Sequence, residues 1–498
     1  MGNSINAISP SVVYLSKKDN QPPPIETMFK LPSPLPAWPQ GAGFASGTID
    51  LGGLRICQVS TFNKVWATHE GGPDNLGATF FEPSSIPVGF FTVGYYSQPN
   101  NSPLFGWVLA AKDASSGQGI LSKPTDYTLI WSSESLNIKQ DGVGYIWLPT
   151  PPDGYKAIGH VVTSSPDKPS VEKVRCVRSD YTDATDLDSW IWGSSNGINI
   201  YGSRPKVRGI QVLGVSTVNW FFQNGALLYT RGQESNPVAI TPTGSNLPQG
   251  GTNDGAYWID LPRDNAAKDR VKQGNLQDAS VYIHVKPMLG ATFTDLAVWV
   301  FYPFNGADRA KVEFVTIKLG KIGEHVGDWE HVTLRISNFN GELKSVYFSE
   351  HSGGTWISAS GLEFQNGNKP VVYSSLHGHA AYPKTGDFLQ GSNSNVGIRN
   401  DAGKGQFFMD AGANFSVVSA DYLGPTIVEP PWLNYTREWG PKISYNINDE
   451  IKKVEKFLPG KLKSALEKAV SELPSEVLAE EGPTGPKSKD NWSGDERT

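Results

Sequence analysis

The stretch Pro87-Val88-Gly89-Phe90-Phe91-Thr92-Val93-Gly94 decides the fold class of the first half of this chain, because it occurs twice. It returns as Pro152-Asp153-Gly154-Tyr155-Lys156-Ala157-Ile158-Gly159, with the proline, the aromatic residue and both glycines displaced by the same 65 positions. Each copy is typical of a tight Pro-Gly turn followed by a strand whose aromatic side chain packs inward. Such repetition predicts a pseudo-symmetric β structure, either β-prism-like or a sandwich.

The composition favours the same fold class. The 498 residues suffice for two or three domains, and 53 Gly with 36 Pro are more than a helical protein tolerates. From Met28 to Pro262, short β-like runs are separated by Gly and Pro. A partial third copy of the repeat is Tyr257–Pro262, which is similar to Tyr145–Pro149. We therefore predict a flexible leader over residues 1–27 and a β-repeat domain over residues 28–265.

The pattern changes after the polar stretch Arg263–Arg270, which we interpret as a linker. Val281–Val285 and Leu296–Tyr302 are strong strand signals, so we expect a β-sandwich domain over residues 271–445. Over residues 446–498 we predict a helical and then extended tail, because apolar residues recur at helical spacing before the sequence becomes polar. We expect the short helices to pack on the β domain; an amphipathic helix that binds a partner is the alternative.

Charge and hydropathy exclude several classes of protein. The formal net charge is −6, and no run of Lys or Arg resembles a nucleic-acid patch, so we expect no nucleic-acid partner. The first residues lack the apolar core of a signal peptide, and no segment approaches the length of a membrane span. The expected location is therefore cytoplasmic, with at most peripheral contact to membranes.

The motif Gly323-Glu324-His325-Val326-Gly327-Asp328-Trp329-Glu330-His331 is the centre of a histidine cluster. Five of the eight histidines of the chain fall between positions 325 and 379. Side chains alternate along a strand, so Asp328 and Glu330 should share one face while Trp329 and His331 share the other. Gly323 and Gly327 allow the backbone to bend, so that His325 can fold back toward the two carboxylates.

A histidine with two carboxylates suits a divalent cation, with Ca²⁺, Mg²⁺ or Mn²⁺ preferred to Zn²⁺. The alternative is a hydrogen-bonded polar network that braces a turn, with Trp329 in the core. His377 and His379 follow a strand signal that ends at Tyr373, and alternation would place both beside the motif if the strands pair. Together with His331 they are candidates for moving protons.

These segments carry a resemblance. Phe44–Gly53, Gly72–Gly77, Tyr302–Gly306, the 323–331 motif, and His377–His379 with Arg437–Pro441 resemble the plant and fungal family of vacuolar protein sorting-associated protein 62. The match runs from about Met28 to Trp492. The family name implies a link to vacuolar trafficking, but it implies no mechanism.

The second domain also resembles, more distantly, the necrosis- and ethylene-inducing cytolysins, which are β-sandwich toxins. His325, Asp328, Trp329 and Glu330 match their signature in the same spacing, and the resemblance implies that the His, Asp and Glu help to hold a divalent cation. A further aspartate of that family corresponds to Asn305 here, and Asp308 is close enough in sequence to substitute for it. His325, Asp328, Glu330, Asn305 and Asp308 are therefore the predicted metal ligands.

Three functions fit these observations. The first is a binding protein for vacuolar sorting or trafficking, whose cation contacts membrane lipid head groups or whose surface contacts trafficking proteins. The second is a metal-dependent hydrolase in which His331, His377 or His379 shuttles protons. The third is a cytolysin-like, membrane-active defence protein. No nucleophile elbow, phosphate loop or metalloprotease helix occurs in the sequence, which favours the first.

Overall fold

The computed structural model describes residues 45–102, 104, 106–114, 119–193, 198–206, 228–231, 238–241, 243–276, 279–312, 315–351, 353–393, 396–420, 427–442, 446–456, 458–471 and 482–496. The predicted leader, residues 1–27, lies outside these ranges. Short strands dominate the described chain, and two of its three α-helices lie near the C-terminal end, which confirms the mainly β prediction with a short helical C-terminal region. Within the same ranges no helix is long and apolar enough to cross a membrane.

The chain divides into two compact units. The first contains residues up to 208 together with 289–292 and 337–342, and the second contains the remainder. The strands of the first unit are β1 Thr48–Asp50, β2 Leu54–Val59, β3 Phe62–Ala67, β4 Ala78–Pro83, β5 Phe91–Thr92, β6 Tyr96–Pro99, β7 Val108–Asp113, β8 Leu121–Ser122, β9 Asp126–Ser132, β10 Tyr145–Thr150, β11 Tyr155–Lys156, β12 Val161–Thr163, β13 Cys176–Arg178, β14 Thr185–Gly193 and β15 Asn199–Pro205.

The two copies of the repeat fold alike in the first unit. The amide of Phe90 donates to the carbonyl of Pro87 at 3.0 Å, and the amide of Tyr155 donates to that of Pro152 at 3.1 Å. The turn glycines, Gly89 and Gly154, have φ angles of 82° and 80°, a conformation that favours glycine. A two-residue strand then pairs with a longer neighbour in each copy, β5 with β7 and β11 with β13. The repeat seen in the sequence is thus a repeat of structure.

The final glycines of the two copies, Gly94 and Gly159, meet back to back. A Cβ atom added at Gly94 would lie 2.9 Å from Cα of Gly159, so the backbones approach more closely than any side chain permits. Next to this contact the amide of Tyr95 donates to the carbonyl of His160 at 3.1 Å. The glycines therefore set the distance between the two copies.

The boundary between the units differs from the one predicted at residues 265–271. The polar stretch interpreted as a linker forms most of helix α1, Asn265–Gln273, and the side chain of Asp264 caps it by accepting from the amide of Ala267 at 2.8 Å. The predicted third copy of the repeat falls in strand β18, Tyr257–Asp260, where Ile259 is fully buried in the core of the second unit. This segment is therefore part of the core of the second unit, despite its similarity in sequence to Tyr145–Pro149.

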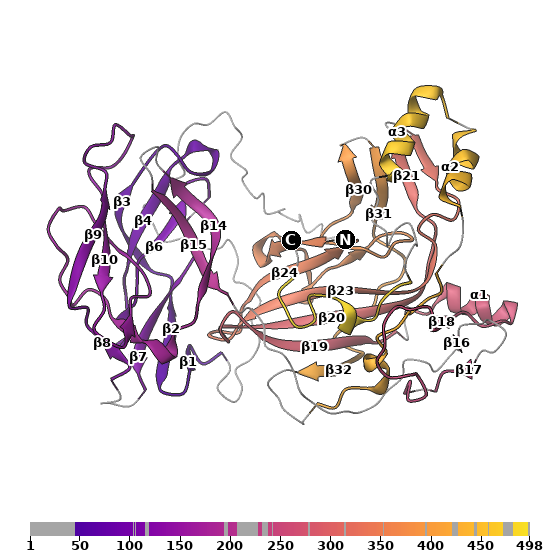
Figure 1. Ribbon diagram of the computed structural model, residues 1–498, viewed down its shortest axis with the longest axis horizontal. Coiled ribbons are helices and arrows are strands. Elements are labelled where there is room, and N and C mark those ends of the chain that lie inside the picture. Colours follow the sequence, from indigo (N-terminus) through magenta and orange to yellow (C-terminus); the bar gives the residue numbers. More distant parts are fainter. Residues whose placement is uncertain are drawn as a thin grey trace, which may run out of the picture. The chain divides into compact units, whose positions relative to one another are not determined.

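The second unit is built on a six-stranded sheet in the order β25-β24-β23-β20-β19-β32, antiparallel along the described pairs except that β32 runs parallel to β19 (Figure 1). Its strands are β19 Val281–Met288, β20 Phe293–Asn305, β23 His325–Ser337, β24 Leu343–Glu350, β25 Gly353–Ser358 and β32 Phe415–Ala420. The remaining strands of the unit are β16 Leu228–Arg231, β17 Val238–Ala239, β18, β21 Arg309–Val312, β22 Val315–Lys318, β26 Phe364–Gln365, β27 Lys369–Pro370, β28 Tyr373–Ser374, β29 Ala381–Tyr382, β30 Gly386–Asn393 and β31 Val396–Ala402.

Aromatic side chains form the core on one face of this sheet. Trp329 stacks on Trp432 with ring centres 5.4 Å apart, and it meets Trp439 edge-on at 5.2 Å. All three indoles are buried, as is Trp299 on the neighbouring strand β20. Trp329 is therefore a core residue, as the alternative interpretation of the motif expects.

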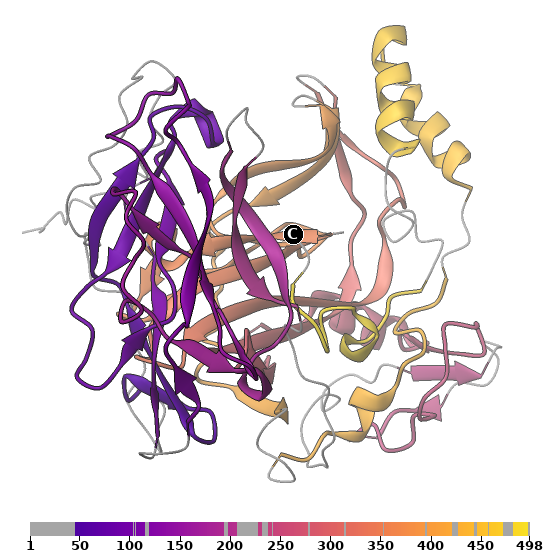
Figure 2. The ribbon, with the colours of Figure 1, turned by 60° about the vertical axis from the view of Figure 1, so that its left-hand side comes forward.

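A smaller sheet, in the order β22-β21-β31-β30, carries the C-terminal helices α2, Ile447–Glu455, and α3, Gly460–Ser471 (Figures 1 and 2). Ala310, Val312 and Ile398 of the sheet are buried against apolar residues of the helices, among them Ile451 and Leu466. The prediction that the helical tail packs on the β domain is therefore correct.

The contact between the two repeats gives a stability prediction. We expect Gly94→Ala to lower the free energy of unfolding by roughly 1–3 kcal/mol, because the new methyl group forces two backbones apart. Gly202→Ala in β15 is the matched control, since a Cβ atom there lies 3.4 Å from Cβ of Asp188. Denaturant titration of the full chain measures both variants. Equal losses in the two would contradict this account of the repeat contact.

Candidate functional site

Strand β23 places the residues of the motif on two faces, as alternation predicts. Trp329 enters the aromatic core, and Asp328 lies on the other face, where it meets His379. Glu330 shares the face of Asp328 and accepts a hydrogen bond from the hydroxyl of Ser349 at 2.7 Å. His331 is on the same face as Trp329 and stacks on Trp299 at 4.4 Å. A single strand therefore separates a polar centre from a hydrophobic core.

Asp328 is the centre of the polar face. Its Oδ2 atom lies 3.3 Å from Nδ1 of His379, and the His379 ring stacks on Tyr302 of β20 with ring centres 3.9 Å apart and planes 5° from parallel. The Tyr302 hydroxyl in turn lies 3.4 Å from that of Ser374. His379 has a φ angle of 54°, which a histidine adopts only where its surroundings impose it. Stacking on Tyr302 and the contact with the Asp328 carboxylate together fix the orientation of the His379 ring.

The charges around Asp328 favour its ionised form. Burial raises the pKa of this carboxyl, but the hydrogen bond from His379 and the positive charges of His325, His379 and Lys489 outweigh it, and the pKa falls below its ordinary value. Burial lowers the pKa of His325, while the charge of Asp328 and the hydrogen bond to Gly327 oppose this shift. Nδ1 of His325 lies 2.9 Å from the carbonyl oxygen of Gly327, the geometry in which Nδ1–H donates and Nε2 keeps its lone pair.

Asn305 and Asp308 lie beside this centre, and both approach Gly323. The Asn305 amide donates to the Gly323 carbonyl at 3.0 Å, while its Oδ1 atom is buried and has no hydrogen-bond partner among the described residues. A Cβ atom at Gly323 would lie 2.2 Å from Oδ2 of Asp308, so the glycine leaves room for that carboxylate. Burial, aided by the charge of Asp328 and opposed by that of His351, raises the pKa of Asp308 to about 6.

The remaining histidines have other partners. Nε2 of His377 lies 3.5 Å from Nη2 of Arg309, and Nε2 of His351 lies 2.8 Å from Oδ1 of Asn400. The structure thus brings His325, Asp308 and His379 into the electrostatic environment of Asp328. As these side chains stand, the described part of the chain contains no group of three or more His, Cys, Asp or Glu that could hold a metal ion. The metal ligands therefore stay a prediction.

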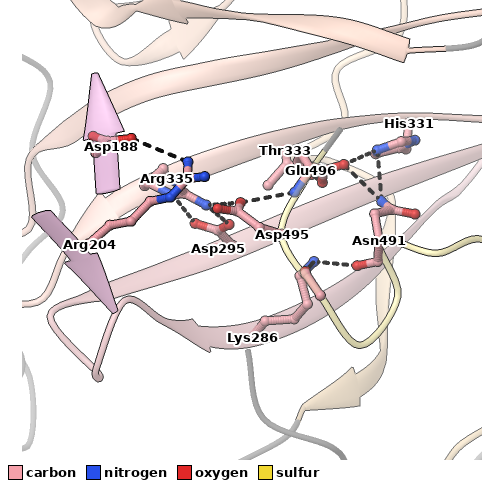
Figure 3. A network of polar contacts seen from close by, with 11 residues as sticks. Asp188, Arg204, Lys286, Asp295, His331, Thr333, Arg335, Asn491, Asp495 and Glu496 are labelled. Atoms are coloured by element: carbon pink, nitrogen blue, oxygen red, sulfur yellow. Dashed lines mark hydrogen bonds and ion pairs between the residues drawn. The ribbon is translucent and has the colours of Figure 1, made fainter. Parts of the chain in front are cut away.

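A second polar network lies on the opposite face of β23, and no local pattern in the sequence indicated it. Figure 3 shows residues 491–496 lying over strands β19, β20 and β23. Nε2 of His331 lies 3.0 Å from Oε2 of Glu496, and Thr333 donates to the other carboxylate oxygen. The Lys286 ammonium is buried and donates to the carbonyls of Asn491 and Gly494 at 2.8 and 3.1 Å.

Arg335 extends this network to two aspartates. Its guanidinium binds Asp295 through two hydrogen bonds of 2.9 and 2.7 Å, and Asp495 through a third of 2.6 Å. Trp492 stacks on His284 of β19 with ring centres 3.9 Å apart. The described C-terminal segment is thus part of the fold of the second unit. His331 lies beneath it, on the face away from Asp328, and therefore cannot act with Asp328.

The chain is thus a mainly β protein of two units whose second unit carries a buried acid–histidine centre. It belongs to the family described as vacuolar protein sorting-associated protein 62, whose sequence model matches residues 25–217 and 215–496. The vacuolar protein sorting-associated protein 62 of Saccharomyces cerevisiae is 29% identical over 110 residues. That alignment covers 20% of this chain and 22% of the yeast protein, so the chain spans about a fifth of the length of this relative.

Among solved structures, a similarity was found to the crystal structure of GNIP1Aa from Chromobacterium piscinae. It covers 30% of this chain and 33% of that chain at 19% identity, with a TM-score of 0.23. The boundary between the two matched segments falls close to the division between the two units at residue 208.

The raised pKa of Asp308 predicts a pH-dependent stability difference. The pKa of the Asp308 carboxyl group is about 6 in the folded protein and 3.8 ordinarily. Such a group destabilises the fold as pH rises from the ordinary value through the folded one. We expect Asp308→Asn to be more stable than the parent above pH 6, by roughly 1–3 kcal/mol, and equal to it below pH 4. Denaturant titrations across pH measure this. The exposed Asp269→Asn is the control, and a difference that persists in acid would contradict the assignment.

Glu496 predicts the opposite dependence. Burial raises its pKa, but the charge and hydrogen bond of His331, with Lys286 and Thr333, lower it to about 2. Its contribution to stability is therefore present above the ordinary value of 4.5 and is lost as pH falls toward 2. We expect Glu496→Gln to cost roughly 3 kcal/mol at pH 7 and little at pH 2, measured by the same titrations. A loss independent of pH would indicate a steric effect instead.

Proposed function

We propose that this protein serves vacuolar sorting as a binding protein, and that the centre around Asp328 holds a divalent cation through which it contacts membrane lipid head groups. Family membership supports the sorting role. The observation that carries the cation is the unpartnered Oδ1 atom of Asn305, which is buried beside Asp308. A buried oxygen without a donor is costly, and a cation would supply what it lacks.

The donors around Asp328 suit a hard cation. Asp328 and Asp308 are carboxylates that act on each other electrostatically, and a cation between like charges would relieve the cost of burying both. His325 has the arrangement usual for a metal-binding histidine, with one ring nitrogen directed at a backbone carbonyl and the other free to bind. Because the other donors are oxygens, we propose Ca²⁺, Mg²⁺ or Mn²⁺ in preference to Zn²⁺.

A cation held by few protein ligands keeps positions for water or for an outside oxygen. Phosphate and sugar oxygens of a lipid head group are ligands of this kind. Glu330 lies two residues beyond Asp328 on the same face of β23, where it is hydrogen bonded to Ser349. It would add negative charge to the centre, which favours cation binding.

A metal-dependent hydrolase is the second candidate, and the contact between His379 and Asp328 is what favours it. A histidine held by a carboxylate can accept a proton from water activated at a nearby cation, and ring stacking on Tyr302 fixes its orientation. His377 lies on the same segment but contacts Arg309. The cytolysin-like alternative stays a prediction.

The cation proposal predicts the effect of replacing Asp328. We expect the parent protein to bind Ca²⁺ or Mn²⁺ in a calorimetric titration, and Asp328→Asn to lose at least about tenfold in affinity because a charged ligand becomes neutral. The exposed Asp269→Asn is the matched control. Elemental analysis of purified protein gives a second readout. If parent and Asp328→Asn bind equally, or if neither binds, the cation centre is refuted.

The sorting role is tested separately in cells. Yeast lacking its own vacuolar protein sorting-associated protein 62 would receive this chain or its Asp328→Asn variant, and the secreted fraction of a soluble vacuolar hydrolase would be measured. We expect the parent chain to reduce secretion and the variant to do so less. If neither the parent chain nor the Asp328→Asn variant changes hydrolase secretion, although both proteins are present at equal levels, the sorting role is refuted.

A further inference from the structure

We propose that one face of the small sheet of the second unit is a binding site for a phosphate-bearing lipid head group that requires no divalent cation. This basic face is formed by the side chains of Arg309, Lys311, Lys318 and Arg399, with His377 at its edge. It goes beyond the cation centre, because it recognises the anion directly.

The alternation of the strands defines the basic face. Ala310 and Val312 of β21 and Ile398 of β31 are buried against helices α2 and α3. Their neighbours along the strands, Arg309, Lys311 and Arg399, must therefore project from the other side of the sheet. Lys318 of β22 follows the same rule, since Ile317 packs toward the helices and Lys318 is exposed.

Like charges lie directly opposite each other on this face. Arg309 and Lys318 are cross-strand partners in the register of β21 and β22. Directly opposed cations destabilise a sheet unless something negative lies between or above them. Nε of Arg309 is buried and has no hydrogen-bond partner among the described residues. Its remaining contacts are long, at 3.5 Å to Asp401 and 3.5 Å to Nε2 of His377.

The carboxylates on this face are engaged mainly by Arg399. Arg399 binds Asp401 at 2.6 Å and Asp387 at 2.9 Å. Among the described residues, Arg309 and Arg399 form the ion pairs with these two carboxylates, and Lys311 and Lys318 form none with them, on a protein whose formal net charge is −6. His377 responds to this excess: burial lowers its pKa, and the charges of Arg309, His379 and Lys318 lower it further, while Asp401 opposes them. The local field is positive and attracts anions.

Guanidinium and ammonium groups at the spacing of paired strands suit a phosphate group. We assign it to a lipid because an apolar residue lies at the edge of the basic face. Leu376 precedes His377, half of its surface is exposed, and its amide donates to the carbonyl of Asp401 at 2.8 Å. A lipid surface offers both a phosphate for the cations and an apolar layer for this side chain.

The test measures cosedimentation of the full chain with vesicles of phosphatidylcholine alone or with added phosphatidylinositol phosphate, in the presence of a chelator. We expect binding to the phosphorylated vesicles, weakened by high salt. The double variant Arg309→Gln, Lys318→Gln should bind at least about tenfold more weakly than the parent. Each basic residue near an anionic surface contributes a similar amount to the binding free energy, and the variant lacks two of them. The control is Lys384→Gln, Lys452→Gln, which changes the net charge equally, with Lys452 on α2.

Thermal unfolding separates binding from folding. Because the double variant removes both of the opposed cations, its unfolding temperature should be unchanged or higher than that of the parent. Equal vesicle binding by both double variants would overturn the basic face. Binding of a soluble inositol phosphate without binding to vesicles would overturn the assignment to a lipid. Vesicle binding that needs Ca²⁺ and is lost with chelator would overturn this inference while supporting the cation centre, so the two proposals fail separately.

Discussion

The packing of Trp329 against Trp432 and Trp439 is the interaction on which the second unit depends. It fixes which face of β23 is turned inward, since a shift of one residue would exchange every side chain between the faces. Asp328 is held on the polar side because the next residue is anchored in the core. The same anchor places His331 beneath the C-terminal segment and keeps it from the centre. A hydrophobic contact therefore determines the geometry of a polar site.

That polar site is costly to build. Asp328 and Asp308 are both buried near each other, and the amide oxygen of Asn305 has no donor among the described residues. A protein selected for stability alone would replace such groups, so their presence is the kind of local conflict that marks a functional centre. The network around Glu496 differs, because each carboxylate there has a cationic or hydroxyl partner, which suits a structural role.

Alternation along β23 could be predicted from the sequence because it is a local property of the strand. The turn repeat ending at Gly94 and Gly159 was also readable, although the contact between the two glycines was not. The pairing of His331 with Glu496 spans 165 positions, and no local pattern reveals it. The linker predicted at Arg263–Arg270 was wrong because polar residues on an exposed helix resemble those of a loop. Burial of Ile259 likewise depends on residues near position 432.

The basic face shows why net charge and runs of charged residues alone do not exclude a site for an anionic ligand. Arg309, Lys318 and Arg399 are far enough apart in sequence that no run of positive charge appears, yet three neighbouring strands gather them on one surface. A negative net charge limits long-range attraction to anions, but within a Debye length the local cations dominate the field. His377 contacts Arg309, and His379 two residues later contacts Asp328, so one short segment joins the basic face to the acidic centre. Binding an anion at one would make binding a cation at the other more favourable, because each ligand neutralises charge that the other must approach.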